Sequence, residues 1–177
     1  MSLASELGPQ ARAASTEDAI AGADTIVFAV WLDTIKELIM RDAQLLKNKT
    51  VVDPSNPLSF DESGQMIRSL PEGQSAGSVL AALLPTSSHY VKAFGTLSAD
   101  ALANSSSSEP RKVLFYATDD ETAAMNTERL IRAAGFEPLK VGGVADAGRI
   151  ELPGGDLFGT LFDLDGARAA IMEKESA

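Results

Sequence analysis

The residues best suited to chemistry follow two short apolar runs. The first group ends a run at residues 25–30 and consists of Ala29, Val30 and Trp31. The second group follows a run at residues 50–52 and consists of Asp53, Pro54, Ser55, Asn56 and Pro57. Because the two prolines cannot continue a ladder or a helix, the second group forms a rigid polar loop. Ligands of open α/β sheets bind beyond the carboxyl ends of strands, so both groups are expected to border a small-molecule site.

Three other features admit both a chemical and a structural interpretation. Trp31 is the only tryptophan, and its ring would either stack on a ligand or pack in the core. His89 is the only histidine and would act as an acid, a base or a ligand, or simply stand at the entrance of a strand. The run Asp119-Asp120-Glu121 would hold a divalent metal or cap a helix. Capping is the simpler explanation, because acidic groups complement the positive end of the helix dipole.

Residues 73–77 match G-x-S-x-G, the pattern of the hydrolase nucleophile elbow. The elbow needs a strand directly before the serine, but Leu70-Pro71-Glu72 does not favour one. No acidic residue lies between Ser75 and His89, as the usual order of a catalytic triad would require. Ser75 is therefore expected to cap a helix, and a serine hydrolase that uses Ser75 is kept as a remote alternative.

Strand and helix signals alternate along the chain. Strands are expected at residues 10–14, 25–30, 50–52, 90–94, 112–117 and 137–141. Helices are expected at residues 17–21, 31–46, 76–84, 99–103, 118–134 and 164–173, whereas residues 60–74 are expected to form a loop. This alternation predicts an α/β fold with a mainly parallel sheet and helices on both faces.

Composition narrows the class of partner. The 177 residues carry a net charge of −10, with 45% hydrophobic and 23% charged residues, which is ordinary for a globular protein. The negative charge opposes binding to nucleic acid or to an anionic membrane. The absence of cysteine excludes disulfides, thiol nucleophiles and thiolate metal sites. With no apolar run of membrane-spanning length and no secretory signal, a cytoplasmic location is expected.

A series of short segments resembles the NADPH-dependent coenzyme F-420 reductases, also called F-420-dependent NADP oxidoreductases. The series runs in order over residues 18–24, 29–31, 51–57, 75–82, 91–96, 117–121, 139–143 and 147–151. The resemblance implies a partial NAD(P)-binding Rossmann-like domain at residues 1–143 and a small helical extension of it at residues 144–177. It also implies a homodimer that passes a hydride between the nicotinamide of NADP and the deazaflavin ring of coenzyme F-420.

The same resemblance assigns the cofactor contacts residue by residue. It places Ala29, Val30 and Trp31 along the NADP. It places Pro54, Ser55, Asn56 and Pro57 where the two rings meet, and Phe94, Gly95 and Thr96 beside the nicotinamide. It assigns no catalytic acid or base and no metal, because the protein stacks two rings face to face in a dry cleft.

The sequence departs from this family at its beginning. The family starts with a strand, a glycine-rich turn and a helix, and neither G-x-G-x-x-G nor a Walker A loop occurs in the 177 residues. A chain truncated in this way is expected to bind NADP weakly or not at all, since the diphosphate loses its helix N-terminus. Residues 25–30 would then form an exposed strand edge, which another chain or residues 1–23 must cover. A non-catalytic, dimerising remnant of the fold is therefore the alternative to an active oxidoreductase.

Overall fold

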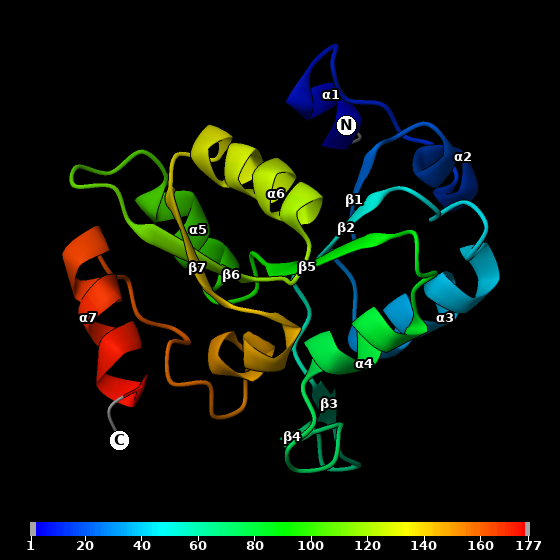
Figure 1. Ribbon diagram of the computed structural model, residues 1–177. Helices are drawn as coiled ribbons and strands as arrows, with labels where there is room; N and C mark the ends of the chain where they lie inside the picture. The colour runs from blue at the N-terminus through cyan, green and yellow to red at the C-terminus, as the bar shows by residue number, and fades with distance from the viewer. Residues whose placement is uncertain (1–2, 176–177) are drawn as a thin grey trace.

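A five-stranded sheet forms the centre of the molecule in a computed structural model that describes residues 3–175 (Figure 1). Its strands are β1 (Thr25–Val27), β2 (Thr50–Asp53), β5 (His89–Ala93), β6 (Val113–Ala117) and β7 (Glu137–Gly142), in the order β1-β2-β5-β6-β7. The β1–β2, β2–β5 and β6–β7 pairs are parallel, and the β5–β6 pair is antiparallel. The mainly parallel Rossmann-like sheet predicted from the sequence is therefore confirmed.

Helices cover both faces of this sheet, as Figure 1 shows. One face carries α5 (Ala99–Ser105) and α6 (Glu121–Ala133). The other face carries α3 (Leu32–Asp42), α4 (Ala76–Leu83), the 3-10 helix η1 (Val144–Ile150) and the C-terminal helix α7 (Leu164–Glu175). The short helices α1 (Leu3–Leu7) and α2 (Thr16–Ala21) precede the sheet. The division of the chain at residue 143 stays a prediction, since η1 and α7 pack against the same sheet.

The strands are buried on both faces because their apolar residues alternate between two cores. In β2, Val51 packs with α3 and α4, whereas Val52 packs with the α6 side. In β6, Phe115 faces η1 and α7, whereas Leu114 faces α6. This two-residue period explains why these strands appear as continuous apolar runs in the sequence.

Strand β1 is shorter than its apolar run. The amides of Ala29 and Val30 donate to the carbonyls of Val27 and Phe28, at 3.1 and 2.8 Å, and these bonds turn the chain out of the sheet. Helix α3 starts directly afterwards, with Trp31 as its N-cap. The predicted strand-to-helix turn is thus real, and it lies at the carboxyl end of β1. The strand expected at residues 10–14 is wrong, since these residues form no strand.

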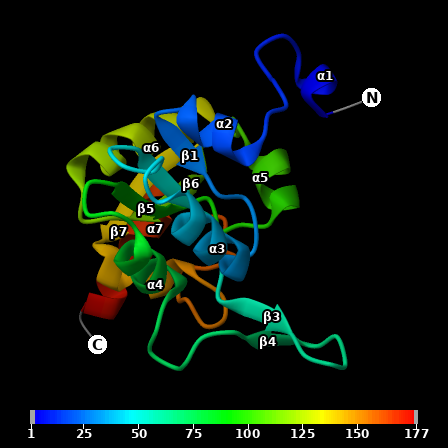
Figure 2. The ribbon, with the colours of Figure 1, turned by 90° about the vertical axis from the view of Figure 1, so that its right-hand side faces the viewer.

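The loop expected at residues 60–74 is also wrong in part. Residues on both sides of the turn pair as a hairpin of β3 (Leu58–Phe60) and β4 (Met66–Arg68), which projects from the body in Figure 2. The Asp61 carboxylate closes the turn by accepting the amides of Ser63 and Gln65 at 2.8 and 2.9 Å. Strands of three residues, without a longer alternating pattern, leave too little periodicity to be predicted.

Candidate functional site

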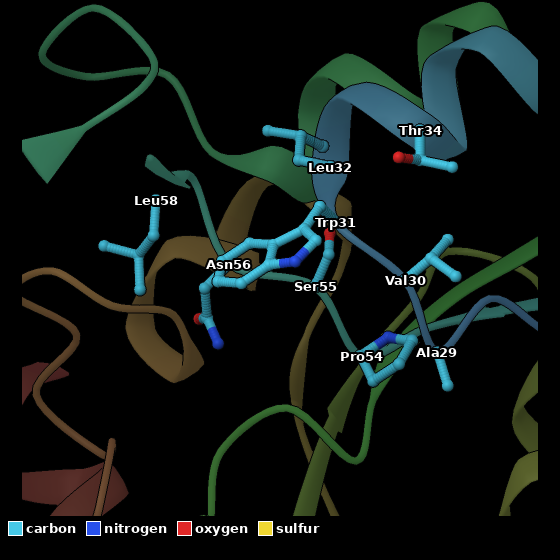
Figure 3. A pocket seen from close by; sticks show the side chains of 9 residues that line it. All are labelled: Ala29, Val30, Trp31, Leu32, Thr34, Pro54, Ser55, Asn56 and Leu58. Atoms are coloured by element: carbon cyan, nitrogen blue, oxygen red, sulfur yellow. The ribbon is translucent and has the colours of Figure 1, made fainter. Parts of the chain in front are cut away.

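An open groove of ≈ 690 Å³ lies at the carboxyl ends of β1 and β2 (Figure 3). Six of the residues predicted to contact the cofactor line it, namely Ala29, Val30, Trp31, Pro54, Ser55 and Asn56. Leu32, Thr34 and Leu58 complete the lining and were not predicted. The groove forms because two loops from neighbouring parallel strands end at the same edge, with the first turn of α3 above them. This is the place where open α/β sheets bind ligands.

Trp31 forms the exposed wall of the groove. Its side chain is 58% exposed, which answers the question left open by the sequence in favour of an accessible ring rather than a core residue. The indole projects from the start of α3 toward Asn56 and Leu58 in Figure 3. The Phe60 ring of the hairpin supports it from the side in an edge-to-face contact with a centroid distance of 5.8 Å. Trp31 therefore offers a ligand ring an aromatic face.

Asn56 fastens the groove to two other segments instead of presenting a free amide. Its Nδ2 donates to the Gly95 carbonyl at 3.2 Å, and its Oδ1 accepts the Leu152 amide at 2.7 Å. The loop after β2 is thereby tied to the loop after β5 and to the segment after η1. Asn56 therefore fixes the shape of the groove through its side chain.

A buried charged cluster lies beneath the same loop. Lys92 is 1% exposed, and its Nζ donates to the Asp53 carboxylate at 2.9 Å and to the Ser55 carbonyl. The Tyr90 hydroxyl donates to the same Asp53 oxygen at 2.8 Å. Burial, together with the adjacent Asp53 carboxylate, raises the pKa of Tyr90 well above its ordinary value. Lys92, Asp53 and the Tyr90 hydroxyl thus all have partners, which is the condition under which such buried charges are tolerated.

Glu151 extends this cluster to helix α4. Its two carboxylate oxygens accept the amides of Ala76 and Gly77 at 2.8 and 2.9 Å, and Oε1 lies 3.4 Å from Lys92 Nζ. A carboxylate at a helix N-terminus meets both the free amides and the positive end of the dipole. Gly77 is required there, because a Cβ atom would lie 2.5 Å from the Ala147 side chain. No local sequence pattern indicates the role of Glu151, since its partners are 74 and 75 residues away.

The other predicted cofactor residues lie next to the groove but do not line it. Pro57 accepts the Ser69 amide and anchors the hairpin. Phe94 has a positive φ of 66° and packs against the α6-side core. Gly95 lies against Pro54, whose carbonyl oxygen would be 2.3 Å from any Cβ at that position. Thr96 is buried, and its carbonyl accepts the Gly159 amide at 2.9 Å. The contact of Pro57 with the ring junction, and of Phe94, Gly95 and Thr96 with the nicotinamide, stays a prediction.

The remaining candidate residues have structural partners. Ser75 is the N-cap of α4 and accepts the Ser78 amide at 2.9 Å, which confirms the capping role expected for it. Asp120 caps α6 by accepting the Ala123 amide at 2.8 Å, as expected for the acidic run. His89 stands at the start of β5, and its Nδ1 lies 2.7 Å from Asp120 Oδ2. Burial opposes the Asp120 carboxylate, but the hydrogen bonds from His89 and Ala123 outweigh it, so the pKa of Asp120 is lowered.

The groove fits a flat, partly polar ligand better than a metal ion. Trp31 provides a ring face, and the loops after β1 and β2 provide an apolar floor with Ser55 in it. Among residues 3–175, no three His, Asp or Glu side chains converge as metal ligands would. No helix in the same range is long and apolar enough to cross a lipid bilayer. Fold and groove together define the class of dinucleotide-binding α/β proteins.

Comparison with known proteins narrows this class. The model of the family described as NADP oxidoreductase coenzyme F420-dependent matches residues 1–57. The metalloreductase STEAP3 of Rattus norvegicus is 33% identical over 135 residues, which are 76% of this chain and 26% of that protein. The chain therefore spans about a quarter of the length of this curated relative. Residues 1–57 are therefore similar to the F-420-dependent NADP oxidoreductase family, and 135 residues of the chain are similar to a metalloreductase.

Solved structures agree with this assignment at the level of the fold. A hypothetical protein from Sinorhizobium meliloti has a TM-score of 0.70 and 29% identity, over 82% of this chain and 68% of the other. A protein of Arthrobacter sp. FB24, to which an F-420-dependent NADP reductase activity is ascribed, has a TM-score of 0.66 and 23% identity, over 76% and 61%. A semialdehyde dehydrogenase NAD-binding protein from Cupriavidus necator, solved with calcium and NAD, has a TM-score of 0.51 and 17% identity, over 98% and 57%.

Proposed function

We propose that this protein is an oxidoreductase whose groove holds the nicotinamide half of NADP against a second redox ring, that of coenzyme F-420 or a similar deazaflavin. The observation that carries the proposal is the convergence of Ala29, Val30, Trp31, Pro54, Ser55 and Asn56 on one groove. The resemblance to the F-420 reductases assigns these residues to the cofactor. The similarity of residues 1–57 to a family of NADP oxidoreductases supports the same assignment.

The protein contributes position to this reaction rather than an acid or a base. A bound reduced nicotinamide would supply the hydride, and a bound deazaflavin would accept it together with one proton from solvent. Trp31 holds one ring face, and its edge contact with Phe60 limits the rotation of the indole. The bonds of Asn56 to Gly95 and Leu152 keep the facing loop in place. Fixing two reactants in contact lowers the barrier without a proton-transfer group.

The strength of NADP binding is a separate part of the proposal. We expect modest affinity, carried mainly by the nicotinamide half, because the groove is open and its lining residues surround that half. We also propose a homodimer, in which a second copy covers the edge of β1. Ser75 is used as a helix cap, and nothing at that position favours the serine hydrolase.

A thermal-shift titration with NADP tests the binding. We expect a saturable rise in the melting temperature at millimolar NADP. Trp31→Ala should weaken the apparent affinity by about two- to tenfold, because an aromatic stack contributes about 0.5–1.5 kcal/mol. Trp31→Phe is the matched control and should keep most of the affinity, since it keeps a ring. No shift in the wild type, or equal shifts in all three proteins, would overturn the proposal.

A further inference from the structure

The first turn of α3 has free hydrogen-bond donors. Trp31 is the N-cap of this helix and makes no side-chain capping bond. The first backbone bond of the helix runs from the Ile35 amide to the Trp31 carbonyl at 3.0 Å. The amides of Leu32, Asp33 and Thr34 therefore precede the first bond of the helix and have no acceptor within it. Leu32 and Thr34 line the groove, so this helix end opens onto the space that a ligand would fill.

A second, independent observation comes from the opposite wall. The Ser55 side chain is buried, with the residue only 7% exposed, and its Oγ has no hydrogen-bond partner among the described residues. Ser55 lines the same groove, and in Figure 3 its hydroxyl points toward the start of α3. The backbone of Ser55 is fixed on both sides, since its amide donates to Asp53 at 2.7 Å and its carbonyl accepts Lys92. Only the hydroxyl is left for a ligand.

We propose that the N-terminus of α3 and the Ser55 hydroxyl form a subsite for a phosphate group. Backbone amides and a hydroxyl that converge from two sides suit a group with several acceptor oxygens, and the helix dipole favours a negative one. The inference rests on the proposed function in that it assigns part of the same groove. It does not require the whole dinucleotide, because the source of the phosphate is either a nucleotide or another phosphorylated compound.

The charges around this subsite set its strength. The Asp33 carboxylate lies in the first turn of α3 and opposes an anion there, but Lys36 neutralises it in part at 2.9 Å. Behind Ser55, the Lys92 ammonium stands between the carboxylates of Asp53 and Glu151. The subsite therefore binds phosphate through directed hydrogen bonds more than through net charge, and its affinity should be modest.

The free Ser55 hydroxyl also predicts an effect without ligand. A buried hydroxyl that lacks a partner costs stability, so its removal is neutral or favourable in the ligand-free protein. We expect Ser55→Ala to have an unchanged or raised melting temperature. The same change should weaken phosphate binding, since it removes a donor that the bound state uses. Stability and binding should thus move in opposite directions, which distinguishes a ligand contact from a structural serine.

Amide NMR shifts during a titration with inorganic phosphate test the proposal, with sodium chloride holding the ionic strength constant. We expect saturable shifts of the Leu32, Asp33 and Thr34 amides. Ser55→Ala should weaken phosphate binding about tenfold, as expected for a hydrogen bond to a charged group. Asp33→Asn should strengthen it about two- to fivefold by removing the opposing charge. Ser59→Ala, in the neighbouring hairpin, is the matched control and should leave the affinity unchanged.

The outcomes separate this inference from the proposed function. Phosphate-dependent shifts at Leu32, Asp33 and Thr34 in a protein that does not bind NADP would support the subsite and contradict the oxidoreductase proposal. NADP binding without any phosphate response at these amides would support the oxidoreductase proposal and contradict the subsite. Equal phosphate affinity in the wild type and Ser55→Ala would overturn the subsite, as would a lower melting temperature of Ser55→Ala.

Discussion

Lys92 is the residue on which the shape of the groove depends most. It is the only cation of the buried cluster and holds Asp53, Glu151 and the Ser55 carbonyl together. Replacing it by methionine keeps the length of the side chain but leaves two buried carboxylates without their cation. We expect Lys92→Met to lower the free energy of unfolding by about 3–5 kcal/mol, as measured by urea denaturation.

Lys140 gives the matched control for this change. It lies on β7, is exposed, and its replacement by methionine should change the free energy of unfolding by less than about 0.5 kcal/mol. A similar small effect of Lys92→Met would show that the cluster contributes little to the stability of the fold.

Tyr90 makes the stability depend on alkaline pH. Burial raises the pKa of its hydroxyl in the folded state above that of the unfolded chain. The unfolded chain therefore loses this proton first, and the contribution of Tyr90 is complete below about pH 10 and falls as the pH rises further. Tyr90→Phe should lower the free energy of unfolding at neutral pH by about 1.5–3 kcal/mol, the range for a hydrogen bond to a charged group.

The pH dependence itself gives the sharper readout. The free energy of unfolding of Tyr90→Phe should fall less steeply above pH 10 than that of the wild type. Tyr116 contributes to the alkaline loss of stability in both proteins, because burial and the hydrogen bond to Glu128 also raise its pKa. Identical slopes in the wild type and Tyr90→Phe would contradict a folded-state pKa of Tyr90 that is raised by burial.

At the scale of elements, the outer edge of β1 is the part of the sheet at which a second copy of the chain would pair. Asp24 and Phe28 bond to β2, at 2.9 and 3.1 Å, so by alternation Thr25 and Val27 direct their backbone groups to the free edge of the sheet. Val27 is 48% exposed although it belongs to an apolar strand. Edges of this kind pair with other strands unless a charge prevents it.

We therefore expect Val27→Lys to convert the proposed dimer into a monomer in analytical ultracentrifugation. A charge at the strand edge opposes edge-to-edge pairing and should leave the sheet intact, since the side chain is exposed. Leu83→Lys is a control at another exposed apolar residue, on α4, and should not change the mass. A wild-type monomer whose Thr25 and Val27 amides exchange freely would contradict the dimer proposal.

The sequence predicts these elements where the signal is local and fails where it depends on contacts. Residues 50–52 and 113–117 are short runs of β-branched, aromatic and aliphatic residues, and Ser75 and Asp120 are common capping residues, so they were placed well. The hairpin of β3 and β4 is too short to show a period. The exposure of Trp31 depends on segments far apart in the chain. So does the bonding of Glu151 to the first amides of α4. The groove was predicted through its two loops, but Leu32, Thr34 and Leu58 join it only in three dimensions.

At the scale of the whole molecule, one edge of the sheet concentrates the features that a redox cofactor requires. The parallel strands β1 and β2 end there, α3 begins there, and the charged cluster around Lys92 holds the second loop from below. The antiparallel pair of β5 and β6 separates this half from β7 and α7, whereas the end of η1 reaches the cluster through Glu151. A site for NADP should therefore be confined to the β1–β2 end of the molecule.

A map of amide NMR shifts on titration with NADP tests this claim most directly. We predict that the largest shifts fall on residues 29–34 and 54–58, with smaller ones at Gly95 and Leu152, which are bonded to Asn56. Residues around the separate cavity at Pro110, Arg111 and Glu137 should not respond and serve as the internal control. Shifts that gather at that cavity, or no saturable shifts at any residue, would contradict the account.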